Sequence, residues 1–252
     1  MSPTAPIKLY QFPLMWGLPN ISPFCMKLET YFRLTGLPYE VIKGDHVFRA
    51  PKRKLPFIDD NGQIIADSSI IIQHLKTRYN DQLDDHLDAT DRAVAHAFQR
   101  MFEESLYWPT LYGRWLDDRN WSWMRGLFFG KLPPVVRQLV QTLAQRKLRR
   151  DCVGQGMGHH TPEQIYAFGC KDIDAVVAFL GDKPFFMGNQ PCTLDATVFG
   201  FLANLLWTPV KSPVIDHARQ YPQLNAYCHR MWARCFADRP LPDHAYQAVA
   251  QS

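Results

Sequence analysis

A chain of 252 residues can form one large domain or two smaller ones, and its 46% apolar and 21% charged residues suit a packed globular core. The net charge of +4 permits weak attraction to anions but does not require a nucleic-acid partner. No apolar run reaches the roughly 18 residues of a membrane span, and no signal peptide is evident, so we expect a cytoplasmic protein. The six cysteines are then expected to be reduced and mostly buried.

The first 80 residues carry an alternating pattern of strands and helices. Short β-branched and aromatic runs predict strands, and apolar residues three or four positions apart predict helices between them. Asp60-Asn61-Gly62-Gln63 is typical of a tight hairpin turn. The order is β-α-β, then a β-hairpin, then a helix, with strands expected at 7–12, 39–42, 55–58 and 64–66 and helices at 23–36 and 68–79.

Beyond an acidic stretch, the sequence favours helices throughout. They are expected at 91–117, 133–150, 162–180, 194–207 and 222–234. The helix at 194–207 is apolar nearly all round and should be buried. The fold class is therefore an α/β N-terminal domain followed by an all-α domain. The expected boundaries are 1–80 for the first domain, 81–89 for a linker, 90–240 for the helical domain and 241–252 for a C-terminal tail.

The expected helix at 133–150 is amphipathic. Its apolar face, which we expect to pack inward, consists of Val136, Leu139, Val140 and Leu143. The basic run at 146–150 is interpreted as a solvated face rather than a patch for membrane or nucleic acid. Cys152 and His159-His160 match no common zinc spacing, so no metal site is expected.

Three segments stand where elements of the first domain begin. Ser22 is a good N-cap ahead of Pro23, at a helix N-terminus that favours an anion such as a thiolate or a phosphate. Leu55-Pro56 precedes a strand, and Asp67-Ser68 opens the second helix. In a thioredoxin-type sheet these segments converge at one edge. No phosphate loop accompanies them, which favours the thiolate.

With these segments the chain resembles the glutathione S-transferase superfamily. The glutathione site of that superfamily combines an N-terminal Ser, Cys or Tyr, a cis-proline loop and an acidic-Ser pair. Ser-Pro-Phe-Cys-x-Lys-x-Glu-Thr, Lys-Leu-Pro-Phe-Ile and Thr-Leu-Asp-Ala-Thr-Val are similar to the Fax/metaxin-like branch. The resemblance covers the whole chain and implies a thioredoxin-like, glutathione-binding domain at 1–80 and a glutathione S-transferase fold overall.

The resemblance implies that Ser22 stabilises the thiolate of glutathione. A thiol with a reference pKa near 8.5 is only about 3% thiolate at pH 7, and lowering the pKa by about two units needs roughly 2.7 kcal/mol. One hydrogen bond to a charged acceptor (about 1.5–3 kcal/mol) and a helix N-terminus (about 0.3–1 kcal/mol) together have this size. The implied activity is glutathione conjugation, or a related reaction, on a hydrophobic electrophile, as in detoxification.

The other roles implied by the resemblance fall on the remaining segments. The Leu55 backbone would pair with the cysteinyl part of glutathione, with Leu55–Pro56 cis. Asp67 and Ser68 would hold the γ-glutamyl group, and Lys54, or Lys52, the glycyl carboxylate. Side chains interpreted either as packing or as borders of the co-substrate pocket are Trp16, Tyr107, Trp108, Tyr112 and Trp115.

Several alternatives stay open. Ser22 can be only an N-cap, and Tyr10 is a second candidate for the catalytic hydroxyl. Cys25 looks like the second member of a redox pair whose first cysteine is replaced by Ser22, and we expect it to be inert. The branch also implies a rival function, a non-catalytic binding or assembly protein, with the long loop at 14–21 covering the site. A homodimer is expected from the family alone.

Asp195 is expected to be structural. In the superfamily a Ser/Thr-x-x-Asp capping box opens the central helix of the second domain. Here Cys192 holds the Ser/Thr position and is a poor cap, so the adjacent Thr193 is the alternative cap with a shifted geometry.

Overall fold

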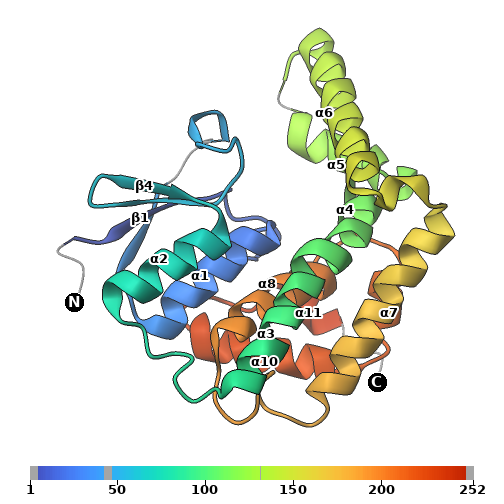
Figure 1. The fold of residues 1–252 in the computed structure, drawn as a ribbon. Coiled ribbons are helices and arrows are strands. Elements are labelled where there is room, and N and C mark those ends of the chain that lie inside the picture. The colour runs from blue at the N-terminus through green and yellow to red at the C-terminus, as the bar shows by residue number, and fades with distance from the viewer. Residues whose placement is uncertain (1–4, 43–46, 131, 248–252) are drawn as a thin grey trace. The chain divides into compact units, whose positions relative to one another are not determined.

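The computed structural model describes residues 5–42, 47–130 and 132–247, which divide into two compact units. The first unit comprises residues up to 99, 179–208 and those from 222 on. The second comprises 100–178 and 209–221. The first unit therefore contains the sheet together with helices from the C-terminal half of the sequence (Figure 1).

A four-stranded sheet in the order β2-β1-β3-β4 organises the first unit. The strands are β1 (Ile7–Tyr10), β2 (Tyr39–Ile42), β3 (Phe57–Asp60) and β4 (Gln63–Ala66). β1 pairs parallel with β2 and antiparallel with β3, and β3 pairs antiparallel with β4. The predicted β-hairpin turn is confirmed, with positive φ at Asn61 and Gly62. β3 begins at Phe57 rather than Leu55, because Pro56 has no N–H to donate to a ladder.

Two helices lie side by side against this sheet (Figure 1). They are α1 (Pro23–Thr35) and α2 (Ser68–Tyr79). α1 ends at Gly36, whose φ of 70° provides the left-handed C-cap. On its other side α1 packs against α8 (Thr193–Leu206), the predicted buried helix, in which every residue after Thr193 is buried. A Cβ at Gly200 of α8 would lie 2.8 Å from the backbone nitrogen of Lys27 in α1, so glycine permits the two helices to pack this closely.

The remaining elements complete the chain. They are 3₁₀ turns at Val47–Arg49 and Met157–His159, α3 (Ala89–Arg100), a π-helical segment at Met101–Leu106, α4 (Tyr107–Trp115), α5 (Asp118–Phe129), α6 (Pro134–Gln155), α7 (Pro162–Leu180), α9 (Pro213–Ala218), α10 (Pro222–Cys235) and α11 (Asp243–Gln247). The sequence did not predict α5, α9 or the short α11 within the expected tail. In α5, Gly126 weakens the helical signal. α9 has only 6 residues, too few for a periodic spacing of apolar residues to be recognised.

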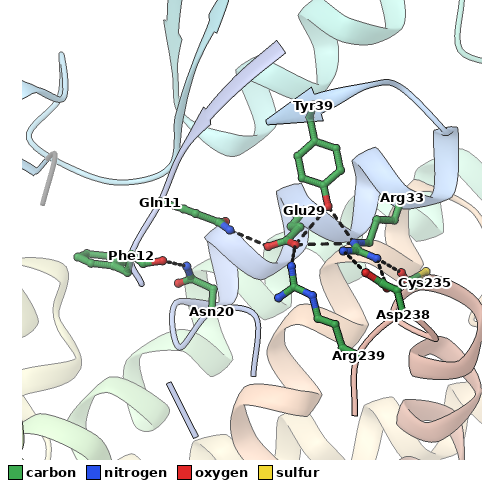
Figure 2. A network of polar contacts seen from close by, with 9 residues as sticks. All are labelled: Gln11, Phe12, Asn20, Glu29, Arg33, Tyr39, Cys235, Asp238 and Arg239. Carbon is green, nitrogen blue, oxygen red and sulfur yellow. Dashed lines mark hydrogen bonds and ion pairs between the residues drawn. The ribbon is translucent and has the colours of Figure 1, made fainter. Parts of the chain in front are cut away.

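A buried polar network holds α1 in place (Figure 2). Its centre is Glu29, whose side chain is fully buried. Gln11 donates to one carboxylate oxygen at 2.6 Å, and Tyr39 and Arg239 donate to the other at 3.2 and 2.9 Å. Arg33 lies 3.7 Å from the same oxygen. The network therefore links α1 to the end of β1, to β2 and to the chain after α10.

The N-terminus of α8 carries the expected capping carboxylate. Asp195 accepts hydrogen bonds from the Phe186 N–H at 2.8 Å, the Cys192 N–H at 2.9 Å and the Tyr227 hydroxyl at 2.8 Å. Burial raises the pKa of Asp195, and these donors oppose the rise. The alternative cap is wrong: Cys192 occupies the N-cap and Thr193 is the first helical residue. A cap moved to Thr193 is unnecessary, because Asp84 accepts the Thr193 N–H at 2.7 Å.

The predicted inward face of α6 is wrong. Val136, Leu139 and Leu143 are 46%, 60% and 54% exposed. α6 instead turns its opposite side toward α4, where Leu148 and Cys152 join an apolar cluster. Amphipathicity located the apolar face, but the packing of the neighbouring helices decides which face is covered. Among the described residues, no helix combines the length and apolarity that a membrane span requires.

Candidate functional site

The sheet register brings three chain segments to one edge. Tyr10 of β1 lies opposite Phe57 of β3, and Phe57 lies opposite Ala66 of β4, so the three form one row. The next residue beyond the row on each strand is Gln11, Pro56 and Asp67, respectively. These lead directly into the loop before α1, the proline loop and the start of α2. The sheet thus brings together the proline loop, the start of α2 and the beginning of the loop that leads to Ser22.

Ser22 caps α1 and remains partly accessible. It has extended backbone angles, and its N–H donates to Asn20 Oδ1 at 3.0 Å. Its Oγ accepts from the Cys25 N–H at 3.5 Å, which is long for a hydrogen bond. A hydroxyl has two acceptor lone pairs and one donor proton, and capping uses only a lone pair. Capping and donation to a thiolate are therefore compatible roles for Ser22.

The predicted burial of the Cys25 thiol is confirmed, and its inertness stays a prediction. Its side chain is fully buried on the inward side of α1. Burial raises the pKa of Cys25 to about 12, while hydrogen bonds with Ser22 and the Phe12 backbone oppose the rise. Because thiolates rather than thiols are the nucleophiles, Cys25 does not supply one. The six cysteines are unpaired in the structure and five of them are buried, as the sequence predicts for most of them, while their reduced state stays a prediction.

This burial predicts a labelling pattern. Cys170 alone among the six thiols is not buried, and the other five are. With iodoacetamide at pH 8 we expect the native chain to be alkylated at Cys170 first and at the other five only after unfolding, because alkylation needs an accessible thiolate. Peptide mass spectrometry checks this. Alkylation of Cys25 in the native chain at the rate of Cys170 would refute the inert assignment.

The proline loop has the predicted isomer. The Leu55–Pro56 peptide is cis, and both residues are buried. Lys52 Nζ lies 3.8 Å from Asp67 Oδ2, across the edge of the sheet. Lys54 is exposed in the turn before the proline. The role of Lys54 toward a glycyl carboxylate stays a prediction, and Lys52 is the lysine that the structure places beside Asp67.

Asp67 caps α2 with an unusual backbone. Its φ is 88°, in a region that residues other than glycine rarely adopt and that recurs at ligand sites. Its carboxylate accepts the N–H groups of Ser69 at 3.1 Å and Ile70 at 3.4 Å. Ser68, at the first helical position, is buried. The helix therefore starts with an acidic side chain and with backbone N–H groups suited to an anion.

A lysine that the sequence reasoning missed lies under this helix start. Lys27 of α1 is 1% exposed, and its Nζ donates to Ser69 Oγ at 3.1 Å. Gln99 Nε2 donates to the same oxygen at 2.9 Å. The signal in the sequence is a charged residue at helical spacing between the apolar Phe24 and Tyr31.

The loop from Leu14 to Ile21 is anchored within the first unit. The Met15–Leu18 turn includes Trp16 at a φ of 56°, with its side chain partly exposed. Asn20 Nδ2 donates to the Phe12 carbonyl at 2.6 Å, and Asn204 Nδ2 of α8 donates to the Asn20 carbonyl at 3.1 Å (Figure 2 shows the first of these).

The other aromatic candidates are packed. The Tyr10 ring stacks on Phe57 with centroids 4.2 Å apart. In the second unit, an apolar cluster around Leu111, Leu116 and Cys152 contacts the four remaining aromatic side chains, which are Tyr107, Trp108, Tyr112 and Trp115. This contact supports the interpretation as core, and the pocket-wall interpretation stays a prediction. No group of three or more His, Cys, Asp and Glu in the described residues is placed to hold a metal ion.

Comparison with known proteins agrees with this geometry. Residues 23–120 match the model of a glutathione S-transferase N-terminal domain, and residues 169–231 match the model of a glutathione S-transferase C-terminal domain. A glutathione S-transferase from Methylobacterium radiotolerans, in complex with glutathione sulfonate, aligns with a TM-score of 0.59 at 18% identity, covering 93% of this chain and 94% of that one. The predicted fold class is confirmed.

Curated relatives fall into the predicted branch. Failed axon connections of Drosophila melanogaster is 37% identical over 92% of this chain, which spans only 58% of that protein. The isoprene-epoxide–glutathione S-transferase of a Rhodococcus strain is 33% identical over 89% of this chain and 97% of its own. Human metaxin-1 is 29% identical over 89% of this chain and 50% of its own. The resemblance to the Fax/metaxin-like branch is thus confirmed.

Proposed function

Because this chain belongs to the glutathione S-transferase family, we propose that it binds glutathione and transfers its sulfur to a hydrophobic electrophile. The observation that carries the proposal is the shared sheet edge, where the cis Leu55–Pro56 peptide precedes β3, Asp67 follows β4, and the loop that leads to Ser22 follows β1. A cytoplasmic homodimer remains part of this proposal, on the resemblance to the family.

Ser22 is proposed as the residue that activates the thiol. Its accessible hydroxyl at the start of α1 donates to the glutathione sulfur, and this donation favours the thiolate over the thiol. The thiolate then attacks the electrophilic carbon. A carbon–sulfur bond forms, and the leaving group departs with the electron pair of the bond that breaks.

The peptide part of glutathione is proposed to lie along the same edge. The Leu55 backbone pairs with the cysteinyl residue. The Asp67 carboxylate takes the γ-glutamyl ammonium, and Ser68 with the α2 N-terminus takes the γ-glutamyl carboxylate. The buried Lys27 ammonium adds positive charge under this helix start. Lys52, beside Asp67, is better placed than Lys54 to meet a carboxylate at this edge.

A second candidate function is a binding or assembly role without catalysis. Similarity to Failed axon connections and the metaxins supports it. The loop from Leu14 to Ile21, proposed to cover the site, also supports it. A loop held in place by hydrogen bonds limits a substrate's access to the site more than a mobile loop does. The two candidates differ in turnover, since a binding protein that keeps the fold does not accelerate carbon–sulfur bond formation.

Turnover with a chlorodinitrobenzene distinguishes the candidates. In this reaction the glutathione sulfur bonds to the ring carbon and chloride leaves, so the product is followed by absorbance. We expect the chain to raise the rate above that of the buffer in proportion to protein concentration. Glutathione binding without turnover on this aryl halide and on an epoxide would favour the binding role.

A further inference from the structure

The α5–α6 hairpin concentrates the positive charge of the chain. α5 and α6 with their connection, residues 118–155, contain eight lysines and arginines and two aspartates, Asp118 and Asp151, which gives a net charge of +6. Since the whole chain carries a net +4, all other residues together sum to −2. α5 and α6 run side by side in Figure 1, and Gln141 of α6 donates to the Arg125 carbonyl of α5. The hairpin is therefore the cationic part of a chain whose other residues sum to a net negative charge.

One face of α6 is apolar, exposed and continuous with basic residues. Val135, 83% exposed, shares this face with Val136, Leu139 and Leu143. We name these four residues the α6 stripe. At the same helical spacing the face continues into Arg146, Lys147 and Arg150, all exposed, of which Lys147 pairs with Asp151 one turn along the helix. Within the described residues of this 22-residue helix, only Cys152 is buried. On α5, Trp123 and Leu127, four residues apart, are also exposed.

We propose that the α6 stripe and its basic continuation bind the surface of an anionic lipid bilayer. A helix with leucine and valine on one face and a cluster of arginine and lysine lies in the interface, with the apolar side chains among the acyl chains and the cations at the headgroups. Exposed tryptophan suits the same depth. From the sequence, the basic run at 146–150 is interpreted as a solvated face. We assign it the role of binding lipid headgroups because the α6 stripe beside it is exposed.

The charge pattern selects this occupant over two others. A second copy of the chain would bring two cationic hairpins together, each with eight basic and two acidic residues over 118–155, and like charges repel. An acidic protein partner would usually present charges of both signs and a shaped surface. The hairpin instead offers a large excess of basic over acidic residues, eight to two over 118–155, and branched apolar side chains on an exposed helix face, which suits a uniformly anionic, deformable surface.

Vesicle sedimentation tests the proposal without reference to glutathione. The full chain is mixed with vesicles of phosphatidylcholine, or of phosphatidylcholine with about a third phosphatidylglycerol, because anionic lipid recruits basic segments. We expect binding to the anionic vesicles only, weakened by salt. Leu139→Gln with Leu143→Gln, and separately Arg146→Gln with Arg150→Gln, should each weaken binding at least about tenfold. Ile64→Gln, at an exposed apolar residue of β4, is the matched control and should bind as wild type.

Several outcomes would overturn the proposal. These are no sedimentation with anionic vesicles, equal binding by the stripe variant, or equal loss in Ile64→Gln. A dimer in sedimentation equilibrium that the stripe variant dissociates would assign the stripe to a second copy. Binding to polyglutamate but not to vesicles would assign it to an acidic polypeptide. All substituted side chains are exposed, so thermal melts should match the wild type and exclude unfolding as the cause.

Discussion

Ser22→Ala should lower kcat/KM for glutathione conjugation by about 10- to 150-fold near neutral pH, the equivalent of one charge-assisted hydrogen bond of about 1.5–3 kcal/mol. The pKa of the bound glutathione thiol should rise by about one to two units, because the variant loses a donor that favours the thiolate. The loss is therefore greatest at low pH and narrows above the raised pKa, where the thiolate forms without help. A pH–rate profile of kcat/KM, with the thiolate absorbance of the complex, checks both.

The chain contains a matched control for Ser22. Ser212 is also an N-cap followed by proline, and its Oγ accepts the Ile215 N–H at 3.4 Å, as Ser22 accepts the Cys25 N–H at 3.5 Å. Ser212 is buried and belongs to the second unit, whereas the sheet belongs to the first. Ser212→Ala should cost a similar amount of stability and leave the thiol pKa unchanged. If Ser22→Ala also leaves that pKa unchanged, Ser22 is only a cap.

Asp195→Ala should destabilise the chain by about 4 kcal/mol. The substitution leaves the buried N–H groups of Phe186 and Cys192 without their acceptor, and each buried unsatisfied group costs about 1–3 kcal/mol. The Tyr227 hydroxyl loses its 2.8 Å acceptor and keeps only the Asp195 carbonyl at 3.3 Å. Since whole domains are stable by only about 5–15 kcal/mol, this loss is a large share of the free energy of unfolding. Urea unfolding followed by circular dichroism measures the loss.

A second N-cap separates capping from burial. Asp67 also caps a helix, but its side chain is 46% exposed, so water can replace it. Asp67→Ala should therefore cost only about 0.5–2 kcal/mol in the same unfolding experiment. An Asp195→Ala loss no larger than that of Asp67→Ala would contradict a role for Asp195 in satisfying buried donors.

Short-range sequence signals predicted most of the elements of the first domain. Strand alternation, the Asn61-Gly62 turn and the caps at Ser22 and Asp67 are all short-range signals, and each is found in the structure. The cis peptide at Pro56 followed from the resemblance to the family. Lys27 was missed because a lysine on an apolar helix face gains meaning only when Ser69, 42 residues away, is placed beside it.

The helical half was less predictable for a physical reason. The sequence of an amphipathic helix shows which face is apolar. Whether a neighbouring element covers that face depends on contacts between residues distant in sequence. Leu139 and Leu143 were expected inside and are exposed, whereas the packed side of α6 centres on Leu148 and Cys152. The short α9 depends on its cap at Ser212 and on tertiary contacts rather than on periodicity.

Calorimetric titration with glutathione tests the central claim most directly. We expect the wild-type chain to bind with a Kd in the millimolar range or tighter. Asp67→Ala should weaken binding at least about tenfold, because it removes the charged partner of the γ-glutamyl ammonium. Asp117→Ala, which removes the N-cap of α5 that accepts the Arg119 N–H at 3.0 Å, should bind as the wild type does. Absence of binding by the wild type at millimolar glutathione, or an Asp67→Ala variant that binds equally well, would contradict the proposed site.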